Sequence, residues 1–492
     1  MNLATLVSMV TEIKGDEVVV ACGESELTGT QLHARAGRAA VQLLASGATA
    51  LGYLDPNSVD LPVALLASLW ANVPFMPLNY RLAPEQLIEL ARRHPGAMFV
   101  GGGQAAATLR AEGIDAIEAG SVCALDEGEV APAWAEDAEQ VAVLLHTSGT
   151  TAAPKAAVLR HRHLTSYVLG AAELLAAAGE TAVISVPPYH IAGMANLLTN
   201  LFAGRKLVYL PTFSAPAWLA AVEAEEAVRA MVVPTMLARL VEELEVRDQT
   251  APPTLLSLSY GGARTPRPLL ERALARFPEV DFVNAYGLTE TASTIAVLGP
   301  EDHRGARDGD PVALRRLDSV GKVLPDVEVQ VVEDGRVLAP NCLGEIRVRG
   351  GQVSGEYLGV ASSLDPDGWF ATRDLGWLDE DGYLFVQGRG DDTIIRGGEN
   401  IAPEEIEAVL HRHPQVTDVA VVGVPDEEWG EVIAAIVVAT GDLSAEDLRS
   451  FARAELRSSK TPDRVIFRDE LPYSPTGKLQ RAVLRKELAA AV

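Results

Sequence analysis

Short apolar runs alternate with amphipathic stretches through the middle of the chain, from about residue 140 to residue 287. The runs are rich in β-branched residues, and segments such as APAWLAAVEAEEA and RPLLERALARF carry apolar residues at helical spacing. The runs are VAVLLHTS, TAVISVPP, KLVYLP, AMVVPT, SLSYGGA and DFVNAYG. This alternation predicts an α/β fold with a doubly wound, mostly parallel sheet, and ligands beyond the carboxyl ends of its strands.

The pattern changes near residue 318, where apolar and polar residues alternate between tight turns. VEVQVVEDGRVL, GEIRVRG and GYLFVQGRG are typical of antiparallel strands, and the pairs Asp334–Gly335 and Asp381–Gly382 are hairpin signals. We expect an antiparallel β subdomain over about 318–388, within a large N-terminal domain of residues 1–388.

A compact α/β pattern follows GRGDD, at residues 388–392. PEEIEAVL has its apolar residues on one helical face, VAVVGV and VIAAIVVA are typical of strands, and SAEDLRSFARAEL begins with a capping box. We therefore expect a small α+β C-terminal domain over 393–492. The charged, glycine-bearing junction at 389–392 permits a hinge, about which this domain would be mobile.

Composition narrows the class of protein. The 492 residues are enough for two or more cores, and 48% of them are hydrophobic. The net charge of −26 opposes nonspecific binding to nucleic acid or to an anionic membrane. We expect no integral membrane segment, and the N-terminus lacks the marks of a secretory signal, which predicts a cytoplasmic protein. The widely spaced Cys22, Cys123 and Cys342 predict reduced thiols rather than a metal site.

A loop rich in hydroxyl groups follows the apolar run in LLHTSGTTAAPKAAVL, at residues 144–159. Backbone N–H groups, hydroxyls and a following lysine, Lys155, together suit phosphate oxygens. The order of residues is not that of a Walker A loop, and a flexible polar turn has the same composition, so both interpretations stay open at this point. The loop residues are Thr147, Ser148, Gly149, Thr150 and Thr151.

Four further motifs follow: SYGGARTP at 259–266, NAYGLTE at 284–290, the stretch from WFATRD to GRGDD at 369–392, and SPTGKLQR at 474–481. With the hydroxyl-rich loop, they resemble the superfamily of adenylate-forming enzymes, which includes acyl-CoA synthetases, adenylation domains of peptide synthetases and firefly luciferase. The resemblance spans nearly the whole chain, from PFMPLNYRL at residue 74 onward, and acyl-CoA synthetases look most similar.

The resemblance implies how the phosphates of ATP are held. The hydroxyl-rich loop and Lys155 would surround the β- and γ-phosphates, Thr289 would contact the α-phosphate, and Glu290 would coordinate Mg²⁺. Lys478 resembles the lysine that bridges the attacking carboxylate and the α-phosphate, where a cation lowers the repulsion between two anions.

The resemblance also assigns the rest of the nucleotide and the thiol. Asp374 and Arg389 resemble the partners of the ribose hydroxyls, and Asp391 aligns with the hinge residue. Gly397 and Gly398 would line the path of the phosphopantetheine arm of CoA. The base of ATP would lie among Gly261, Gly262, Ala263, Asn284, Ala285 and Tyr286.

His190, in PPYHIAGM, concerns the acid. Such a histidine is commonly a hydrogen-bonded structural residue. In the similar acyl-CoA synthetases, however, this position borders the acyl site and can act as a gate, so we count it among the catalytic candidates. Relatives that activate amino acids generally have an aspartate here, so a neutral imidazole followed by apolar residues predicts an acid with an apolar body. Short-chain, aromatic, long-chain and polycyclic acids remain open. The candidate pocket residues are His190, Gly193, Met194, Val233, Tyr260, Gly262 and Ala285.

Three positions depart from the pattern of the superfamily. Alanine stands at Ala152 and Ala156, and arginine at Arg373, where the relatives more often have glycine. A positive φ at either alanine would cost about 1 kcal/mol or more. The departures put the loop geometry in question but not the chemistry of its residues.

We interpret the chain as an ATP-dependent acyl-CoA synthetase of fatty acid metabolism, which is an AMP-forming acid–thiol ligase. It would convert a carboxylic acid, ATP and CoA into acyl-CoA, AMP and pyrophosphate through an acyl-adenylate, with Mg²⁺ as cofactor. One alternative is a stand-alone adenylation enzyme that loads an aryl or amino acid onto a carrier protein. Another is a catalytically weak relative that only binds adenylates. Assembly as a homodimer is left open.

Overall fold

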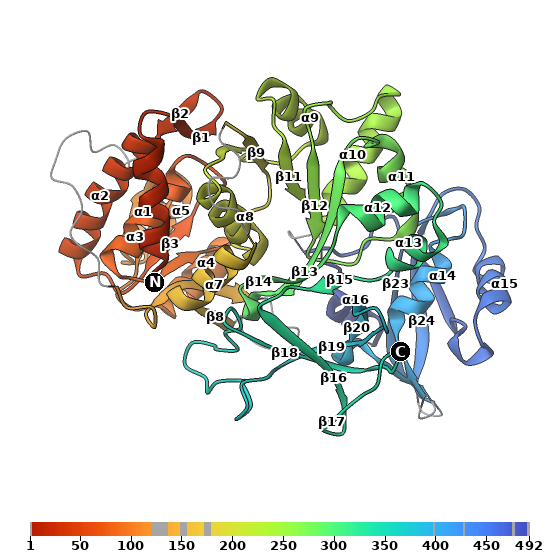
Figure 1. The fold of residues 1–492 in the computed structure, drawn as a ribbon. Coiled ribbons are helices and arrows are strands. Elements are labelled where there is room, and N and C mark those ends of the chain that lie inside the picture. Colours follow the sequence, from red (N-terminus) through yellow and green to blue (C-terminus); the bar gives the residue numbers. More distant parts are fainter. Residues whose placement is uncertain are drawn as a thin grey trace.

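The computed structural model describes residues 2–119, 136–147, 155–171, 179–396, 399–426, 429–474 and 478–489. These residues form three β-sheets with helices packed on their faces (Figure 1). Two of the sheets belong to the main body, defined here as residues 2–389, and the third belongs to the C-terminal unit, residues 393–489. Among the described residues, no helix combines the length and the hydropathy needed to cross a membrane.

A six-stranded sheet lies in the N-terminal part of the main body, in the order β6-β5-β3-β4-β7-β8. Its strands run parallel except β8, which pairs antiparallel with β7. The strands are β3 (Leu51–Leu54), β4 (Phe75–Pro77), β5 (Met98–Gly101), β6 (Ala116–Glu118), β7 (Val141–Thr147) and β8 (Lys155–Arg160). The accompanying helices are α1 (Leu3–Lys14), α2 (Gly29–Ser46), α3 (Asp60–Ala71), α4 (Pro84–Arg92), α5 (Gly103–Ala111) and α7 (His161–Ala171).

A fourteen-stranded sheet forms the rest of the main body, in the order β17-β16-β18-β19-β20-β15-β14-β13-β12-β11-β9-β10-β1-β2. Its central parallel strands are β1 (Val18–Cys22), β10 (Lys206–Tyr209), β9 (Thr181–Ile184), β11 (Arg229–Val232), β12 (Ser257–Gly261) and β13 (Asp281–Leu288), and β2 (Ser25–Thr28) pairs antiparallel with β1. Its helices are α8 (Ile191–Phe202), α9 (Ala215–Ala224), α10 (Pro234–Arg247), α11 (Arg267–Arg276), α12 (Pro300–Arg307) and α13 (Pro311–Arg316).

The same sheet continues without a break into antiparallel strands. They are β14 (Ser293–Leu298), β15 (Gly321–Val323), β16 (Val327–Glu333), β17 (Arg336–Val337), β18 (Gly344–Gly350), β19 (Phe370–Leu378) and β20 (Tyr383–Arg389). The expected antiparallel strands are therefore present, but they extend the parallel sheet. The run VAVLLHTS was expected in that parallel sheet and instead forms β7 of the six-stranded sheet.

Local signals in the antiparallel part were read correctly. Asp334 and Gly335 have φ values of 49° and 75°, the left-handed pair that a two-residue hairpin turn requires between β16 and β17. Asp381 and Gly382 lie in the turn between β19 and β20. The positive φ of Gly382, 80°, explains why glycine is found there.

The C-terminal unit is built on a third sheet, with strand order β22-β21-β24-β23 and with β25 paired to β24. Its strands are β21 (Ile394–Arg396), β22 (Glu399–Ile401), β23 (Val416–Asp426), β24 (Gly430–Ala439) and β25 (Arg464–Phe467). Its helices are α14 (Pro403–Leu410), α15 (Ala445–Glu455) and α16 (Arg481–Ala489), and the short 3₁₀ turns of the chain are η1 (Thr289–Thr291), η2 (Gly390–Asp392) and η3 (Ser458–Lys460).

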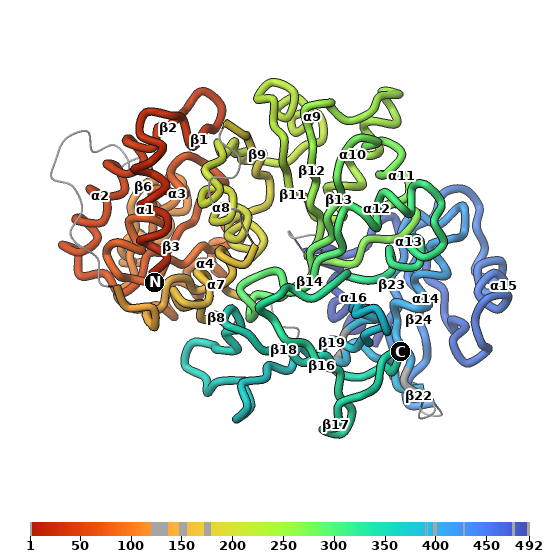
Figure 2. The backbone as a smooth tube through the Cα atoms, viewed as in Figure 1, coloured from red at the N-terminus to blue at the C-terminus, as the bar shows by residue number. Residues whose placement is uncertain are grey.

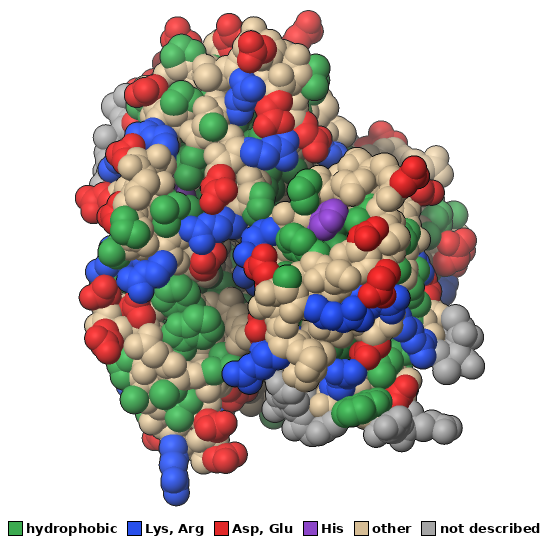
Figure 3. Space-filling model, turned by 90° about the vertical axis from the view of Figure 1, so that its right-hand side faces the viewer, with side chains coloured by type: hydrophobic (Ala, Val, Ile, Leu, Met, Phe, Trp, Pro, Cys, Tyr) green, Lys and Arg blue, Asp and Glu red, His purple; other side chains and the backbone are tan. Residues whose placement is uncertain are grey.

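Helices cover both faces of this third sheet. The apolar face of α14 packs with α15 on one side, through Ile406, Leu410 and Leu448, and α16 covers the other through Leu484 and Leu488. Figure 2 shows the C-terminal segments, in blue, beside the green segment of the main body that carries α13, and α14 contacts β20. On the face seen in Figure 3, acidic and basic side chains are interspersed rather than gathered by sign. The predicted fold class is confirmed, whereas the domain limits and the hinge at 389–392 stay predictions.

Candidate active site

The carboxyl ends of β12 and β13 form the floor of the candidate site. The two strands run parallel with Gly261 opposite Ala285, and a Cβ atom at Gly261 would lie 2.2 Å from the carbonyl oxygen of Ala285. Only glycine allows this close approach of the two strands. Gly262 follows with φ +83°, a left-handed conformation in which the chain leaves β12.

The predicted base and ribose residues come together at this floor. The Tyr286 hydroxyl, at the end of β13, donates a hydrogen bond of 2.5 Å to Oδ2 of Asp374 on β19. Asp374 is only 5% exposed, and it lies opposite Arg389 in the β19–β20 ladder. The antiparallel strands β19 and β20 therefore bring Asp374 and the backbone of Arg389 to the end of the parallel strand β13. Backbone of Arg389 is described, but its side chain is not.

Glu290, the predicted magnesium ligand, lies in η1 directly after β13 and is 9% exposed. Its Oε1 accepts a 2.5 Å hydrogen bond from the hydroxyl of Tyr357. The backbone N–H groups of Ser354 and Gly355 donate to its carbonyl oxygen, at 2.8 and 3.3 Å. Both the side chain and the backbone of Glu290 are thus held from the same loop, and the neighbouring Thr289 is half-buried.

A magnesium ion suits this carboxylate, because Mg²⁺ prefers hard oxygen ligands and keeps water and phosphate oxygens among them. Within the described ranges, no group of three or more His, Cys, Asp or Glu side chains could hold a metal alone. A single buried carboxylate of this kind therefore fits a cation that arrives with ATP. Glu290 would hold it, and the ion would offset the charge of the phosphates.

Tyr357 is a site residue that the sequence analysis missed. It forms an isolated antiparallel bridge with Ala157 of β8, which places its ring 5.5 Å from the Nζ atom of Lys155. Tyr357 therefore touches both the predicted metal carboxylate and the predicted phosphate lysine. The segment VSGEYLGV has no helical or strand periodicity, and no pattern in it singles out the tyrosine.

Replacing Tyr357 with phenylalanine should raise the KM for Mg-ATP about tenfold with a smaller change in kcat, because a hydrogen bond to a charged group contributes about 1.5–3 kcal/mol. Steady-state kinetics at several Mg²⁺ concentrations would show this. Tyr383→Phe is the matched control, because Tyr383 donates to Asp302 at 3.0 Å in the same sheet but away from these residues. Equal KM values for the two variants would remove the role given to Tyr357.

The positive charge of Lys478, in the C-terminal unit, acts on His190 of the main body. His190 precedes α8 with an extended backbone, and its Nε2 is buried without a hydrogen-bond partner in the described part of the chain. Burial, followed by the positive charges of Lys478 and Arg81, lowers the pKa of His190 to about 3. The imidazole is therefore neutral at ordinary pH, as expected, and the charge of the predicted bridging lysine acts on the predicted acyl-site residue.

The predicted pocket residues divide into two groups. Val233, at the start of α10, lies 3.9 Å from the Cβ position of Gly262, and Ala285 is on the neighbouring strand, so these three share the floor of the site. Met194 and Tyr260 are instead 1% exposed inside hydrophobic cores. The hydroxyl of Tyr260 is hydrogen-bonded to Nε2 of His303 at 2.9 Å, which gives its side chain a structural partner in the core.

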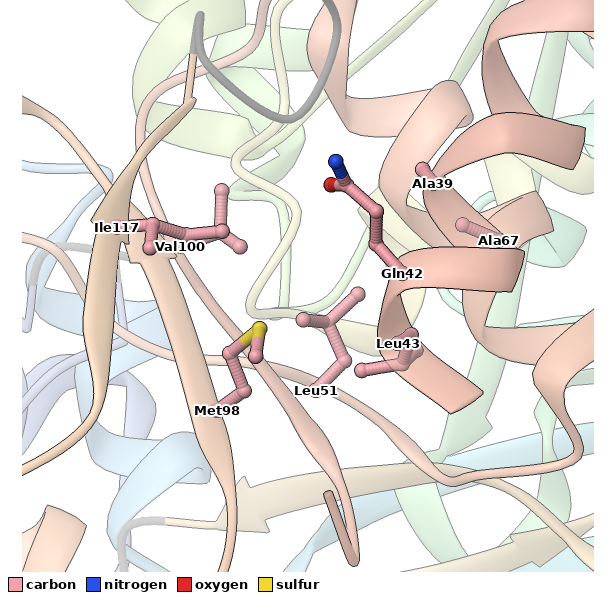
Figure 4. A pocket seen from close by; sticks show the side chains of 8 residues that line it. All are labelled: Ala39, Gln42, Leu43, Leu51, Ala67, Met98, Val100 and Ile117. Carbon is pink, nitrogen blue, oxygen red and sulfur yellow. The ribbon is translucent and has the colours of Figure 1, made fainter. Parts of the chain in front are cut away.

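Gly193 has a packing reason to be glycine, because a Cβ atom there would lie 2.2 Å from the carbonyl oxygen of Pro187. A small cavity of about 10 Å³ exists elsewhere, under the six-stranded sheet (Figure 4). This volume holds about one water molecule, so it offers no room for the acid. Its lining residues are Ala39, Gln42, Leu43, Leu51, Ala67, Met98, Val100 and Ile117.

Part of the predicted phosphate and thiol machinery lies outside the described residues. This applies to Ser148, Gly149, Thr150, Thr151, Ala152, Gly397 and Gly398. Thr147 ends β7 and pairs with Lys155 at the start of β8, and Asp391 is in η2, although the side chains of Thr147 and Asp391 are not described. Asn284 and Ala263 are both half-buried near the ends of β13 and β12.

The backbone conformation is described at two of the three positions where relatives more often have glycine. Ala156 is an extended residue of β8 opposite His146, so it needs no left-handed conformation. Arg373, in contrast, has φ +63° immediately before Asp374. A left-handed arginine costs about 1 kcal/mol or more. The strain expected from a missing glycine is therefore present next to the ribose residue rather than at Ala156.

Fold and site together define the class of adenylate-forming enzymes. The model described as AMP-binding enzyme matches residues 10–358, and the model described as AMP-binding enzyme C-terminal domain matches residues 405–478. The chain belongs to the AMP-binding enzyme family. The predicted superfamily is thereby confirmed.

Several similar proteins are CoA ligases or CoA synthetases. A 2-succinylbenzoate–CoA ligase of Bacillus mycoides is 30% identical over 481 residues, 96% of each chain. The o-succinylbenzoate CoA synthetase of Bacillus subtilis, in complex with the acyl-adenylate intermediate OSB-AMP, matches with a TM-score of 0.86 and 28% identity over 98% of this chain and 97% of that one. Its complex with ATP and magnesium ion matches with a TM-score of 0.84 and 27% identity over 98% of both chains. The predicted AMP-forming acid–thiol ligase, with ATP, Mg²⁺ and CoA, agrees with these relatives.

Proposed function

We propose that this protein is an ATP-dependent CoA ligase that converts a carboxylic acid into its CoA thioester through an acyl-adenylate. The observation that carries the proposal is the contact of Tyr357 with both Glu290 and Lys155, which brings the predicted magnesium carboxylate and the predicted phosphate lysine together. The positive charge of Lys478, from the C-terminal unit, also acts on the buried imidazole of His190, which we place beside the acid.

In the first step, a carboxylate oxygen of the acid attacks the α-phosphorus of ATP, and the bond to pyrophosphate breaks. Lys478 lies between the two anions and stabilises the charge that develops as they approach. Magnesium, held by Glu290, would neutralise charge on the departing phosphates. Asp374, fixed by Tyr286, would keep the ribose in place so that the α-phosphorus stays aligned.

In the second step, the thiol of CoA attacks the acyl carbonyl and AMP leaves with the electron pair of the broken bond. Lys478 occupies the side from which the acid was activated, so the C-terminal unit must rotate about residues 389–392 before CoA enters. The acyl-adenylate stays shielded from water during this exchange. Gly397 and Gly398 would then border the path of the thiol.

We take 2-succinylbenzoate as the first candidate for the acid, because it is named for relatives that cover nearly the whole chain. The floor of Val233, Gly262 and Ala285 is uncharged and built of small side chains, which suits a flat aromatic ring. The relatives do not support the expected place in fatty acid metabolism. Cytoplasmic location and a homodimer stay predictions.

A panel of acids tests this proposal. With ATP, Mg²⁺ and free CoA, 2-succinylbenzoate should give a kcat/KM at least about tenfold above benzoate, short-chain, long-chain and polycyclic acids, because a pocket discriminates by about 1–3 kcal/mol per mismatched group. Pyrophosphate release and thioester formation are the readouts. If another acid is preferred, 2-succinylbenzoate is not the substrate, but the proposed CoA ligase activity stands. The proposed activity would be overturned if thioester formed only on a carrier protein, or if none of the acids supported pyrophosphate exchange.

A further inference from the structure

A buried cluster of charges joins the predicted hinge to α14 and α16. Arg481 is at its centre, with Nη2 at 2.7 Å from Glu407, 3.3 Å from Glu404 and Nη1 at 3.5 Å from Asp392. Arg485 adds a contact of 3.4 Å to Asp392. Three carboxylates therefore face two guanidinium groups, so one carboxylate is in excess.

Glu404 is the most deeply buried of the three carboxylates. Arg481 makes two hydrogen bonds to Glu407, at 2.8 and 2.7 Å, and only the longer contact to Glu404. Glu404 is 7% exposed, and its Oε2 is buried with no hydrogen-bond partner among the residues that the structure describes. A buried oxygen of this kind is costly when it carries charge and much less costly when it is protonated.

The surroundings favour the neutral form. Burial raises the pKa of Glu404 to about 7; Arg481 opposes the rise, while Glu407 and Asp392 add to it. The other charged neighbours are Arg485, which contacts Asp392, and Arg264, which reaches only the backbone of Glu404. Near neutral pH, the group is therefore close to its point of half protonation.

The main body supplies the burial. A Cβ atom at Gly388 of β20 would lie 2.3 Å from Oε2 of Glu404, so the carboxyl group rests directly on the backbone of that strand. Arg264, in the loop after β12, donates from Nη1 to the carbonyl oxygen of Glu404 at 3.3 Å. Side chain and backbone of Glu404 thus both contact the main body across the hinge.

We propose that Glu404 is a positioning residue: its carboxyl group, seated on Gly388, holds the C-terminal unit in the orientation that brings Lys478 to the acid, and leaves this seat when the unit rotates for the CoA step. The inference rests on the proposed two-step function. Arg481 lies three residues after Lys478, so the cluster that contains Glu404 also fixes the segment that carries the lysine.

A proton accompanies the rotation. In water, Glu404 would return to the ordinary pKa of a glutamate, near 4.3, so the seated orientation binds more protons between that value and about 7. The seated orientation is then favoured at low pH, loses ground as pH rises through this window, and changes no further above about 7. Adenylation follows this dependence, whereas transfer from a supplied acyl-adenylate does not need the seat.

Glu404→Gln tests the inference, because the amide has the same shape and carries no proton to lose. In the wild-type protein, the ratio of the adenylation rate to the CoA-transfer rate should fall about tenfold from pH 5.5 to pH 7.5, because the pKa of Glu404 differs by more than one unit between the two orientations. Glu404→Gln should keep a constant ratio. Glu405→Gln is the matched control, since Glu405 is the neighbouring residue of α14 and pairs with Lys460 at 2.7 Å. It should behave as wild type.

A second variant keeps the inference testable if Glu404→Gln misfolds or only disturbs local packing. Gly388→Ala places a methyl group against the seated carboxyl and should lower adenylation about tenfold, a factor worth about 1.4 kcal/mol, while CoA transfer from supplied acyl-adenylate persists. Wild-type pH profiles in Glu404→Gln, or unchanged adenylation in Gly388→Ala, would overturn the inference.

The orientation of the C-terminal unit can also be measured without any acid. This measurement separates a failure of the inference about Glu404 from a failure of the proposed function. Fluorophores on cysteines introduced at the exposed Val246 and Val483, with the three native cysteines replaced by serine, report the distance between main body and C-terminal unit. Energy transfer should change with pH in the otherwise wild-type protein and stay constant in Glu404→Gln. The same pH response in both would contradict the inference even if the enzyme is active, whereas a lost response in Glu404→Gln would sustain it even if no acid is adenylated.

Discussion

Lys478→Ala will lower the rate of acyl-adenylate formation by about 10² or more and leave the transfer of a supplied acyl-adenylate to CoA nearly unchanged. The proposed first step joins two anions, and Lys478 is the cation that would lower their repulsion; its charge acts on His190. The proposed second step involves a neutral acyl carbonyl and would take place after this lysine has moved away. Acid-dependent pyrophosphate exchange measures the first step, and thioester formation from acyl-adenylate measures the second.

Lys486→Ala is the control for this experiment. Lys486 is an exposed lysine of α16, eight residues further along the same segment, and it belongs to none of the contacts described for the site. Both half-reactions should keep their wild-type rates in that variant. An equal loss in both half-reactions of Lys478→Ala would show that the lysine supports the fold rather than the attack on phosphorus.

Glu290→Gln should reduce adenylation by about 10² and shift its Mg²⁺ dependence to higher concentration, because a neutral amide is a poor ligand for a hard divalent cation. The amide oxygen can still accept the hydrogen bond from Tyr357, so the local structure should persist. The measurement is pyrophosphate exchange over a wide range of Mg²⁺ concentrations, together with thermal unfolding.

Asp302→Asn is the matched control for Glu290. Asp302 also accepts a hydrogen bond from a tyrosine, Tyr383, and it lies on α12 away from the site residues. Its removal should affect thermal stability more than the response to Mg²⁺. Indistinguishable Mg²⁺ curves for Glu290→Gln and the wild-type protein would rule out metal binding by Glu290.

Local patterns in the sequence were enough to predict most elements, because they depend on neighbouring residues. Ser444 caps α15 as expected, with its hydroxyl accepting from the N–H of Asp447, but the Asp447 carboxylate accepts from that hydroxyl and the reciprocal bond of a capping box is not seen among the described residues. The apolar face of α14 is buried as predicted. Strand partners depend on residues far apart along the chain. For this reason, neither the continuity of the fourteen-stranded sheet nor the place of β7 in the other sheet could be predicted.

The same distinction applies to the site. The motifs predicted that Tyr286, Asp374 and Lys478 serve one nucleotide, but the contact of Tyr357 with Glu290 depends on a loop that crosses β8 and has no periodic signal. Tyr260 could have been assigned to the core, because it lies two residues after the buried Leu258 and therefore on the same face of β12.

The β19–β20 ladder has a mechanical consequence. Asp374 and Arg389 face each other across it, and the chain leaves the sheet immediately after Arg389 to enter η2. The predicted ribose contacts and the predicted hinge are therefore adjacent at the same end of this ladder. We expect bound nucleotide to stiffen the predicted hinge. With AMP bound, the C-terminal unit should rotate about one defined axis, whereas without nucleotide its orientation should vary more widely.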